Sequence, residues 1–144
     1  MLRSASVDQT RDIGARLGRA AQAGDRFLLE GPFGAGKTTF VQGLAEGLGI
    51  TTPVSSPSFV IETQYRGRLR LYHIDLYRLD RIEDTLLEML AEDLFDDGVS
   101  AVEWPEQLPS DVRAGATVVR FDVVDDARVL TVCTPAARLR DALR

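Results

Sequence analysis

The sequence lacks several features that would favour particular functions. It contains no asparagine, and it has one cysteine, one histidine and one lysine among its 144 residues. The single cysteine, Cys133, cannot form an internal disulfide. No apolar run is long enough to span a bilayer or to act as a signal peptide. These absences predict a cytoplasmic protein with no membrane segment.

The composition also lacks an excess of basic residues. The formal net charge is −5, whereas a protein that binds a nucleic-acid phosphate backbone needs a surplus of Lys and Arg. We therefore expect no direct DNA binding, and any connection to tRNA would be indirect, through a protein partner. The length and the 44% hydrophobic content suffice for one core, so residues 1–144 are predicted to form a single domain.

Hydrophobic spacing predicts helices and strands in alternation. The predicted helices cover residues 6–24, 39–48 and 80–95 and a segment that begins at Pro135. The predicted strands cover residues 27–30, 58–65, 68–75, 99–103, 117–124 and 128–133, with tight turns at Gly67 and at Asp125-Asp126. This mixture of β-α-β units and hairpins predicts an α/β fold, a three-layer P-loop NTPase-like domain with a mixed β-sheet.

A glycine-rich segment follows the first predicted strand. Residues 31–38 read Gly-Pro-Phe-Gly-Ala-Gly-Lys-Thr and match the phosphate-loop pattern G-x-x-x-x-G-K-[ST] at every fixed position. Glycines let successive backbone N–H groups surround a phosphate, and the following helix presents its positive end to the same anion. We predict that Lys37 reaches the outer phosphates of ATP and that the Thr38 hydroxyl binds magnesium. The predicted nucleotide-binding residues of this loop are Gly34, Ala35, Gly36, Lys37, Thr38 and Thr39.

The only lysine of the chain occupies the lysine position of this pattern. All other basic residues are arginines. An ordinary glycine-rich turn before a helix would explain the glycines but not Lys37. A phosphate site explains both, because it needs a slim ammonium where a forked guanidinium fits poorly.

Two predicted strands end in an acidic residue. Asp75 follows the mostly apolar residues 69–74, and Glu103 ends residues 99–103. In phosphate-loop proteins, a carboxylate at the end of a strand lies beside the metal ion. Either acid could bind magnesium directly, act through a water or position the attacking water, and the pattern leaves these roles open.

Three further features accompany the loop and the acids. His73 lies two residues before Asp75 and so faces the same side of its strand, in a structural or a functional role. Trp104 could stack on a base or cover the core. Residues 55–58 read Ser-Ser-Pro-Ser after the loop helix, where related folds carry a switch that senses the third phosphate. The same string is also an ordinary turn.

In this order, the segments resemble the TsaE family, also called YjeE, the ATPase subunit of the bacterial machinery that makes threonylcarbamoyladenosine in tRNA. The likeness covers residues 6–109 and rests on a series of motifs. The motifs are Gly34-Ala35-Gly36-Lys37-Thr38-Thr39-Phe40, Ser56-Pro57-Ser58-Phe59, His73-Ile74-Asp75-Leu76-Tyr77-Arg78-Leu79 and Glu103-Trp104-Pro105-Glu106.

The resemblance implies roles for individual residues. Lys37 and Thr38 would bind the phosphates and magnesium, Glu103 would be a metal ligand, and Asp75 would take part in the hydrolytic site. Thr10 falls where the family places a threonine near the nucleotide. The resemblance also implies the partners TsaB and TsaD, with tRNA reached only through that complex. It further implies a magnesium-dependent ATPase that is slow alone.

Two positions depart from the family pattern. Pro32-Phe33 stands where the family usually has Asp-Leu, which removes a carboxylate and a backbone N–H donor from the outer edge of the loop. Ser58 stands where the family usually has threonine, and it keeps a hydroxyl.

Other functions share a phosphate loop. A small-molecule kinase would need an acceptor pocket and usually an arginine-rich lid, and the only dense arginines are Arg66, Arg68 and Arg70. A non-catalytic module would bind ATP only to hold a shape that a partner recognises. A GTPase would need an N-K-x-D motif to read guanine, and this chain has no asparagine with which to build one.

Overall fold

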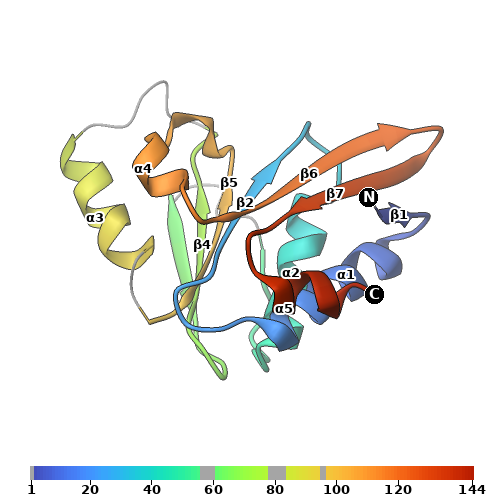
Figure 1. Cartoon of the computed structure of the whole chain (residues 1–144), viewed down its shortest axis with the longest axis horizontal. Coiled ribbons are helices and arrows are strands. Elements are labelled where there is room, and N and C mark those ends of the chain that lie inside the picture. The colour runs from blue at the N-terminus through green and yellow to red at the C-terminus, as the bar shows by residue number, and fades with distance from the viewer. Residues whose placement is uncertain (1, 56–60, 78–83, 95–96) are drawn as a thin grey trace.

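The computed structural model describes residues 2–55, 61–77, 84–94 and 97–144, and it contains a seven-stranded sheet with helices on both faces (Figure 1). The strands are β1 (Leu2–Ser4), β2 (Arg26–Glu30), β3 (Glu62–Tyr65), β4 (Leu71–Asp75), β5 (Val99–Glu103), β6 (Thr117–Val124) and β7 (Ala127–Cys133). The helices are α1 (Val7–Ala20), α2 (Lys37–Gly47), α3 (Asp84–Leu94), α4 (Ser110–Arg113) and α5 (Ala137–Ala142), with a 3-10 turn at Pro105–Gln107. No helix within the described ranges has the length and apolar character needed to cross a membrane.

The sheet has a parallel centre and antiparallel edges. Its order is β1-β7-β6-β2-β5-β4-β3, and the four central strands β6, β2, β5 and β4 pair in parallel. β3 joins β4, β7 joins β6 and β1 joins β7, all antiparallel. Parallel strands occur where helices cover both faces, whereas hairpin strands can form the edges. This arrangement confirms the predicted α/β fold with a mixed sheet.

Two hydrophobic clusters lie on opposite faces of the sheet. Alternate residues of β2 divide between them: Phe27 and Leu29 belong to one cluster and Leu28 to the other. The first cluster includes residues of α1, α2 and α5, and the second includes residues of α3 and α4. Figure 1 shows the same division of the helices. The three predicted layers are therefore present.

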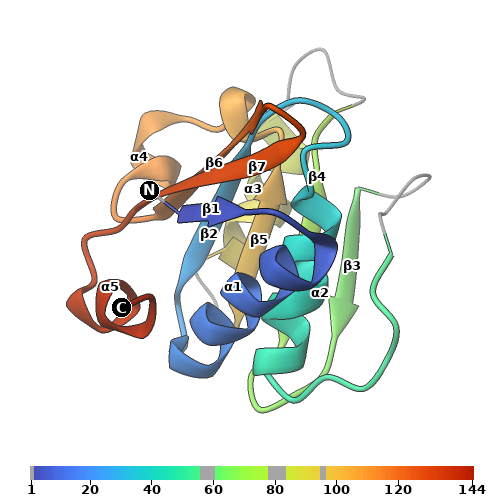
Figure 2. The same cartoon turned by 90° about the vertical axis from the view of Figure 1, so that its right-hand side faces the viewer.

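Glycines bring α1 and α2 into backbone contact (Figure 2). A Cβ atom added to Gly43 would lie 2.1 Å from the carbonyl oxygen of Arg11, and one added to Gly14 would lie 2.3 Å from that of Phe40. The glycines at this contact are Gly14 and Gly18 of α1 and Gly43 and Gly47 of α2. No larger residue fits without moving a helix. The contact therefore fixes the spacing between α1 and the helix that follows the phosphate loop.

Several predicted boundaries differ from the structure. The first helix ends at Ala20, before the predicted end at Gly24, because Ala21 adopts an extended conformation with a φ of −68° and a ψ of 145°. The connection between β3 and β4 covers residues 66–70, which is longer than the predicted tight turn at Gly67. In this connection, the Arg68 guanidinium donates to the carbonyl oxygens of Gly18 and Ala21 at 2.8 and 3.1 Å. β1 and α4 were not predicted. The predicted starts of the strand over 58–65 and of the helix over 80–95 lie outside the described residues.

Candidate nucleotide-binding site

The phosphate loop connects β2 to the N-terminus of α2. Gly31, Gly34 and Gly36 have φ values of 147°, 74° and 103°, which are conformations that favour glycine. Gly36 precedes Lys37, the first residue of α2, and no described side chain caps this helix end. The helix begins two residues before the predicted start at Thr39. Its first N–H groups are therefore available to an anion.

The Lys37 side chain is only 5% exposed and lies against the loop. Its Nζ donates a hydrogen bond to the carbonyl oxygen of Gly31 at 2.7 Å and lies 3.6 Å from the centre of the Trp104 ring. Burial lowers the pKa of Lys37, and the negative charges of Glu103 and Asp75 partly offset this shift. The ammonium is thus held at the place where the pattern predicts a phosphate ligand.

Asp75 and Glu103 are neighbours at the carboxyl ends of parallel strands. They are paired in the register of β4 and β5, and the Leu76 N–H donates to the Glu103 carbonyl oxygen at 3.1 Å. Burial raises the pKa of Asp75, while a hydrogen bond from the Tyr77 N–H to its carboxylate at 3.0 Å acts in the opposite direction. The structure brings both predicted acids to the phosphate loop.

His73 contacts one of these acids directly. Its Nε2 lies 2.5 Å from Oε2 of Glu103, and both side chains are buried. Its Nδ1 is buried without a hydrogen-bond partner in the part of the chain that the structure describes. The sequence left the role of His73 open, and the structure places the ring where it orients the Glu103 carboxylate.

A cavity of about 280 Å³ unites the loop and the acids. It is lined by Phe33, Gly34, Gly36, Lys37, Thr38, Thr39, Asp75, Glu103 and Trp104. The loop N–H groups and the ammonium suit phosphates, and the hydroxyl and carboxylate oxygens suit magnesium. No three His, Cys, Asp or Glu side chains among the described residues form a metal cluster. The residues fit a magnesium ion that shares its ligands with a nucleotide.

A second cavity of about 270 Å³ continues past the loop toward β1 and β7. It is lined by Ser4, Ala5, Ser6, Val7, Thr10, Gly34, Gly36, Thr39, Asp126 and Arg128. Thr10 is buried here, its hydroxyl 2.7 Å from that of Ser4. A Cβ on Gly36 would lie 3.5 Å from Thr10 Cγ2. The resemblance implies that Thr10 lies near the nucleotide, and the structure places Thr10 beside the loop. Sequence reasoning missed the residues from β1 and β7 because their pairing is distant in sequence.

Three aromatic rings form a rim over the loop. The Phe33 ring centre lies 4.4 Å from that of Tyr77 and 5.2 Å from that of Trp104, and the Tyr77 and Trp104 centres are 5.1 Å apart. Trp104 has a φ of 57°, a left-handed conformation that is unusual for a bulky residue. It also packs partly against the second core cluster, as one of its two predicted roles required. The family-atypical Phe33 thus packs with the other two rings.

Comparisons with known proteins agree with this architecture. A sequence profile described as "Threonylcarbamoyl adenosine biosynthesis protein TsaE" matches residues 4–129. The tRNA threonylcarbamoyladenosine biosynthesis protein TsaE of Treponema pallidum is 38% identical over 130 residues, which cover 90% of this chain and 96% of that protein. The protein of the same name from Bacillus subtilis is 45% identical over 135 residues, with 90% and 82% covered.

A solved structure gives the same result for the fold. The crystal structure of YdiB from Bacillus subtilis superposes with a TM-score of 0.80 at 33% identity, and the match covers 99% of this chain and 89% of YdiB. Sequence and fold therefore agree over most of the chain. This protein belongs to the TsaE family.

Proposed function

We propose that this protein is a magnesium-dependent ATPase that takes part in the biosynthesis of threonylcarbamoyladenosine in tRNA. The proteins that it resembles are named for that biosynthesis. The observation that carries the ATPase proposal is the cavity in which Lys37 and Thr38 meet Asp75 and Glu103 at the N-terminus of α2. This combination supplies ligands for phosphates, for a divalent cation and for an attacking water.

Each side chain has a distinct proposed role. The loop N–H groups and Lys37 hold the phosphates. The Thr38 hydroxyl and Glu103 hold magnesium, and His73 orients the Glu103 carboxylate through their 2.5 Å contact. Asp75 positions the water for hydrolysis. Magnesium, when bound, neutralises charge on the outer phosphates.

The remaining part of ATP fits the second cavity. That cavity shares Gly34, Gly36 and Thr39 with the first one, so one ligand can reach both. Thr10 and its partner Ser4 provide hydroxyls for a sugar or a base. We expect ATP to bind more tightly than GTP because the chain has no N-K-x-D motif. A competition experiment in which GTP binds more tightly would contradict this choice.

Lys37→Ala tests the nucleotide site. Removing a charge-assisted contact to phosphate should weaken ATP binding at least about tenfold, since such bonds contribute roughly 1.5–3 kcal/mol. Isothermal titration measures the affinity, and circular dichroism checks the fold. Thr38→Ser, which keeps the hydroxyl, serves as the matched control. Unchanged affinity in folded Lys37→Ala would refute the assignment.

Partners complete the proposed function. We propose that TsaB and TsaD stimulate a slow ATPase in the cytoplasm and that tRNA is reached through their complex, since the acidic chain has no basic surplus for RNA. A group supplied in trans can accelerate phosphate-loop enzymes by about three to five orders of magnitude. Phosphate release should rise when both partners are added and should vanish in Lys37→Ala. Fast turnover that the partners do not change, together with a normal level of threonylcarbamoyladenosine in tRNA after this protein is depleted, would favour an independent kinase or ATPase.

A further inference from the structure

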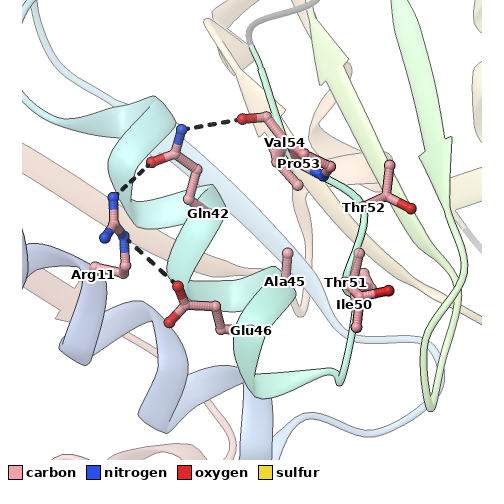
Figure 3. A pocket seen from close by; sticks show the side chains of 9 residues that line it. All are labelled: Arg11, Gln42, Ala45, Glu46, Ile50, Thr51, Thr52, Pro53 and Val54. Atoms are coloured by element: carbon pink, nitrogen blue, oxygen red, sulfur yellow. Dashed lines mark hydrogen bonds and ion pairs between the residues drawn. The ribbon is translucent and has the colours of Figure 1, made fainter.

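Arginine side chains join separate parts of this chain, and Arg11 and Arg113 differ in what they join. Arg11 of α1 pairs with α2: its Nη2 donates to Gln42 Oε1 at 3.3 Å, and its Nε lies 3.8 Å from Oε1 of Glu46 (Figure 3). These three residues line neither cavity of the proposed site. Arg113, the last residue of α4, instead joins two segments that flank the nucleotide site.

Arg113 uses both terminal nitrogens of its guanidinium. Nη1 donates to the carbonyl oxygen of Pro105 at 3.2 Å, and Nη2 donates to Oε1 of Glu30 at 3.1 Å. The side chains of Arg113 and Glu30 are 32% and 18% exposed, so salt screens their ion pair less than it screens a fully exposed one. Because a guanidinium is planar and holds its donors in a fixed fork, it sets the distance between Glu30 and Pro105.

Each of these contacts lies next in sequence to a contact of Lys37. Glu30 precedes Gly31, whose carbonyl oxygen accepts a hydrogen bond from Lys37 Nζ at 2.7 Å. Pro105 follows Trp104, whose ring centre lies 3.6 Å from the same Nζ. The guanidinium therefore bridges the two segments that hold the Lys37 ammonium.

The bridge continues a connection that the sheet begins. β2 and β5 are paired up to Leu29 and Glu103. Beyond this pair, the Arg113 guanidinium joins the end of β2 at Glu30 to the turn after β5 at Pro105. The bridge thus lies at the edge of the sheet where the phosphate loop starts.

The turn after β5 has a backbone that needs such support. Trp104 has a φ of 57° and a ψ of 58°, a left-handed conformation that bulky residues seldom adopt and that persists where the surrounding structure holds it. The carbonyl oxygen of the buried Pro105 accepts from the Leu108 N–H at 3.0 Å and from Arg113. The bond from Leu108 lies within the turn, whereas the bond from Arg113 ties the turn to β2.

We propose that Arg113 is a positioning residue of the nucleotide site, which holds the Trp104 turn against the start of the phosphate loop and thereby fixes the Lys37 ammonium. The proposal rests on the proposed ATPase function. Arg113 lines neither cavity of the site, so it acts through Glu30 and Pro105. Its loss should weaken ATP binding although no ligand of ATP is removed.

Trp104 provides the measurement, because it is the only tryptophan of the chain. Arg113→Met removes both donors and keeps an apolar side chain. Without nucleotide, acrylamide should quench the Trp104 fluorescence of this variant more strongly, since the ring is no longer held over Lys37. In the presence of magnesium, the dissociation constant for ATP should rise about tenfold, the lower end of the effect that residues supporting a metal site from outside have on affinity.

Two further variants separate the bridge from charge and from folding. Arg120→Gln is the matched control: Arg120 is 63% exposed and pairs with the other oxygen of Glu30 at 3.4 Å, so the variant removes a positive charge from the same carboxylate and keeps the bridge. It should behave like the unmodified protein. Arg113→Lys keeps the charge and replaces the fork by a single nitrogen. It should show both changes in smaller form, and it replaces Arg113→Met if circular dichroism shows that the latter is unfolded.

Three results would overturn the proposal. Unchanged quenching in folded Arg113 variants would show that the bridge does not hold the Trp104 turn. Increased quenching with an unchanged ATP affinity would show that this turn does not position the nucleotide site. Equal effects in Arg120→Gln would show that the charge beside Glu30 matters and the bridge does not.

The quenching measurement also separates this proposal from the proposed function. It needs no nucleotide, so it judges the bridge even if the unmodified protein fails to bind ATP. That failure would refute the proposed ATPase function, whereas normal ATP binding in a folded Arg113→Met would refute the role of Arg113 alone.

Discussion

The two faces of the sheet are packed in different ways. On the first face, glycines bring α1 and α2 into backbone contact, and these helices carry Thr10 and Lys37. On the second face, the helices contact the sheet through ordinary side chains such as Leu90 of α3 and Val112 of α4. Backbone contact leaves less room for adjustment than side-chain packing does. A site whose groups come from two helices benefits from the first kind of packing.

The largest expected effect comes from removing the acids that face α1 and α2. Asp75→Ala should bind ATP and lose turnover by about two orders of magnitude or more, as expected for a water-positioning group. Glu103→Ala should instead weaken magnesium-dependent binding. Titrations with and without magnesium and single-turnover assays separate the two effects.

The control for this experiment lies on the second face. Glu92→Ala removes an exposed acid of α3 and should leave binding and turnover unchanged. If Asp75→Ala instead weakens magnesium-dependent binding and Glu103→Ala instead loses turnover, then Glu103 positions the water and Asp75 binds magnesium. An effect of Glu92→Ala as large as either would show that function does not follow the division between the faces.

Gly43→Ala tests the backbone contact itself. The added Cβ would lie 2.1 Å from the Arg11 carbonyl oxygen, so the helices must separate. We expect the free energy of unfolding to fall by about 3 kcal/mol, which is at the upper end of the range for overpacking. ATP affinity should fall as well, because Thr10 and Lys37 move apart. Denaturant unfolding and isothermal titration measure the two quantities.

Leu90→Ala is the control for Gly43→Ala, because it destabilises the packing on the second face of the sheet. Leu90 is 3% exposed, and its truncation should cost about 2–5 kcal/mol of stability. The folded fraction should nevertheless bind ATP with nearly normal affinity, because α3 does not line either cavity of the site. If both variants lower affinity equally at equal loss of stability, the proposed difference between the faces is wrong.

The smallest effect concerns pH and again belongs to the second face. Burial and the neighbouring Asp93 carboxyl of α3 together raise the pKa of Glu62 from 4.5 to about 7, against the opposing effect of a hydrogen bond with Gln64. The folded state thus favours the protonated acid. Protonated Glu62 thus adds to the stability of the folded state, fully below about pH 4.5, and this contribution is lost as the pH rises through about 7.

Glu62→Gln should therefore remove this pH dependence. From pH 5 to pH 8, the free energy of unfolding of the variant should rise relative to that of the unmodified protein by on the order of 1 kcal/mol. This value is smaller than the full pKa shift would give, because the carboxyl is partly solvated. Urea unfolding at the two pH values gives the comparison, with Glu88→Gln, an exposed position on α3, as the control. An equal difference between variant and unmodified protein at both pH values would contradict the assigned pKa.

By itself, the sequence determined the features that depend on neighbours along the chain. The pattern over residues 31–38 predicted the phosphate loop, because a short backbone segment contains the whole motif. Apolar runs that end in Asp75 and Glu103 predicted two acids beside the metal site of the phosphate loop, because a strand-end carboxylate is a local pattern. Hydrophobic spacing predicted the α/β fold for the same local reason.

Only the tertiary structure decided the features that join distant segments. Residues from β1 and β7 complete the cavity beside Thr10, the Trp104 ring lies over Lys37, and the Gln42 side chain donates to the Val54 carbonyl oxygen. The close approach of α1 and α2 belongs to the same class. These contacts depend on how whole elements pack, and the sequence of either partner alone carries no local pattern that specifies the other.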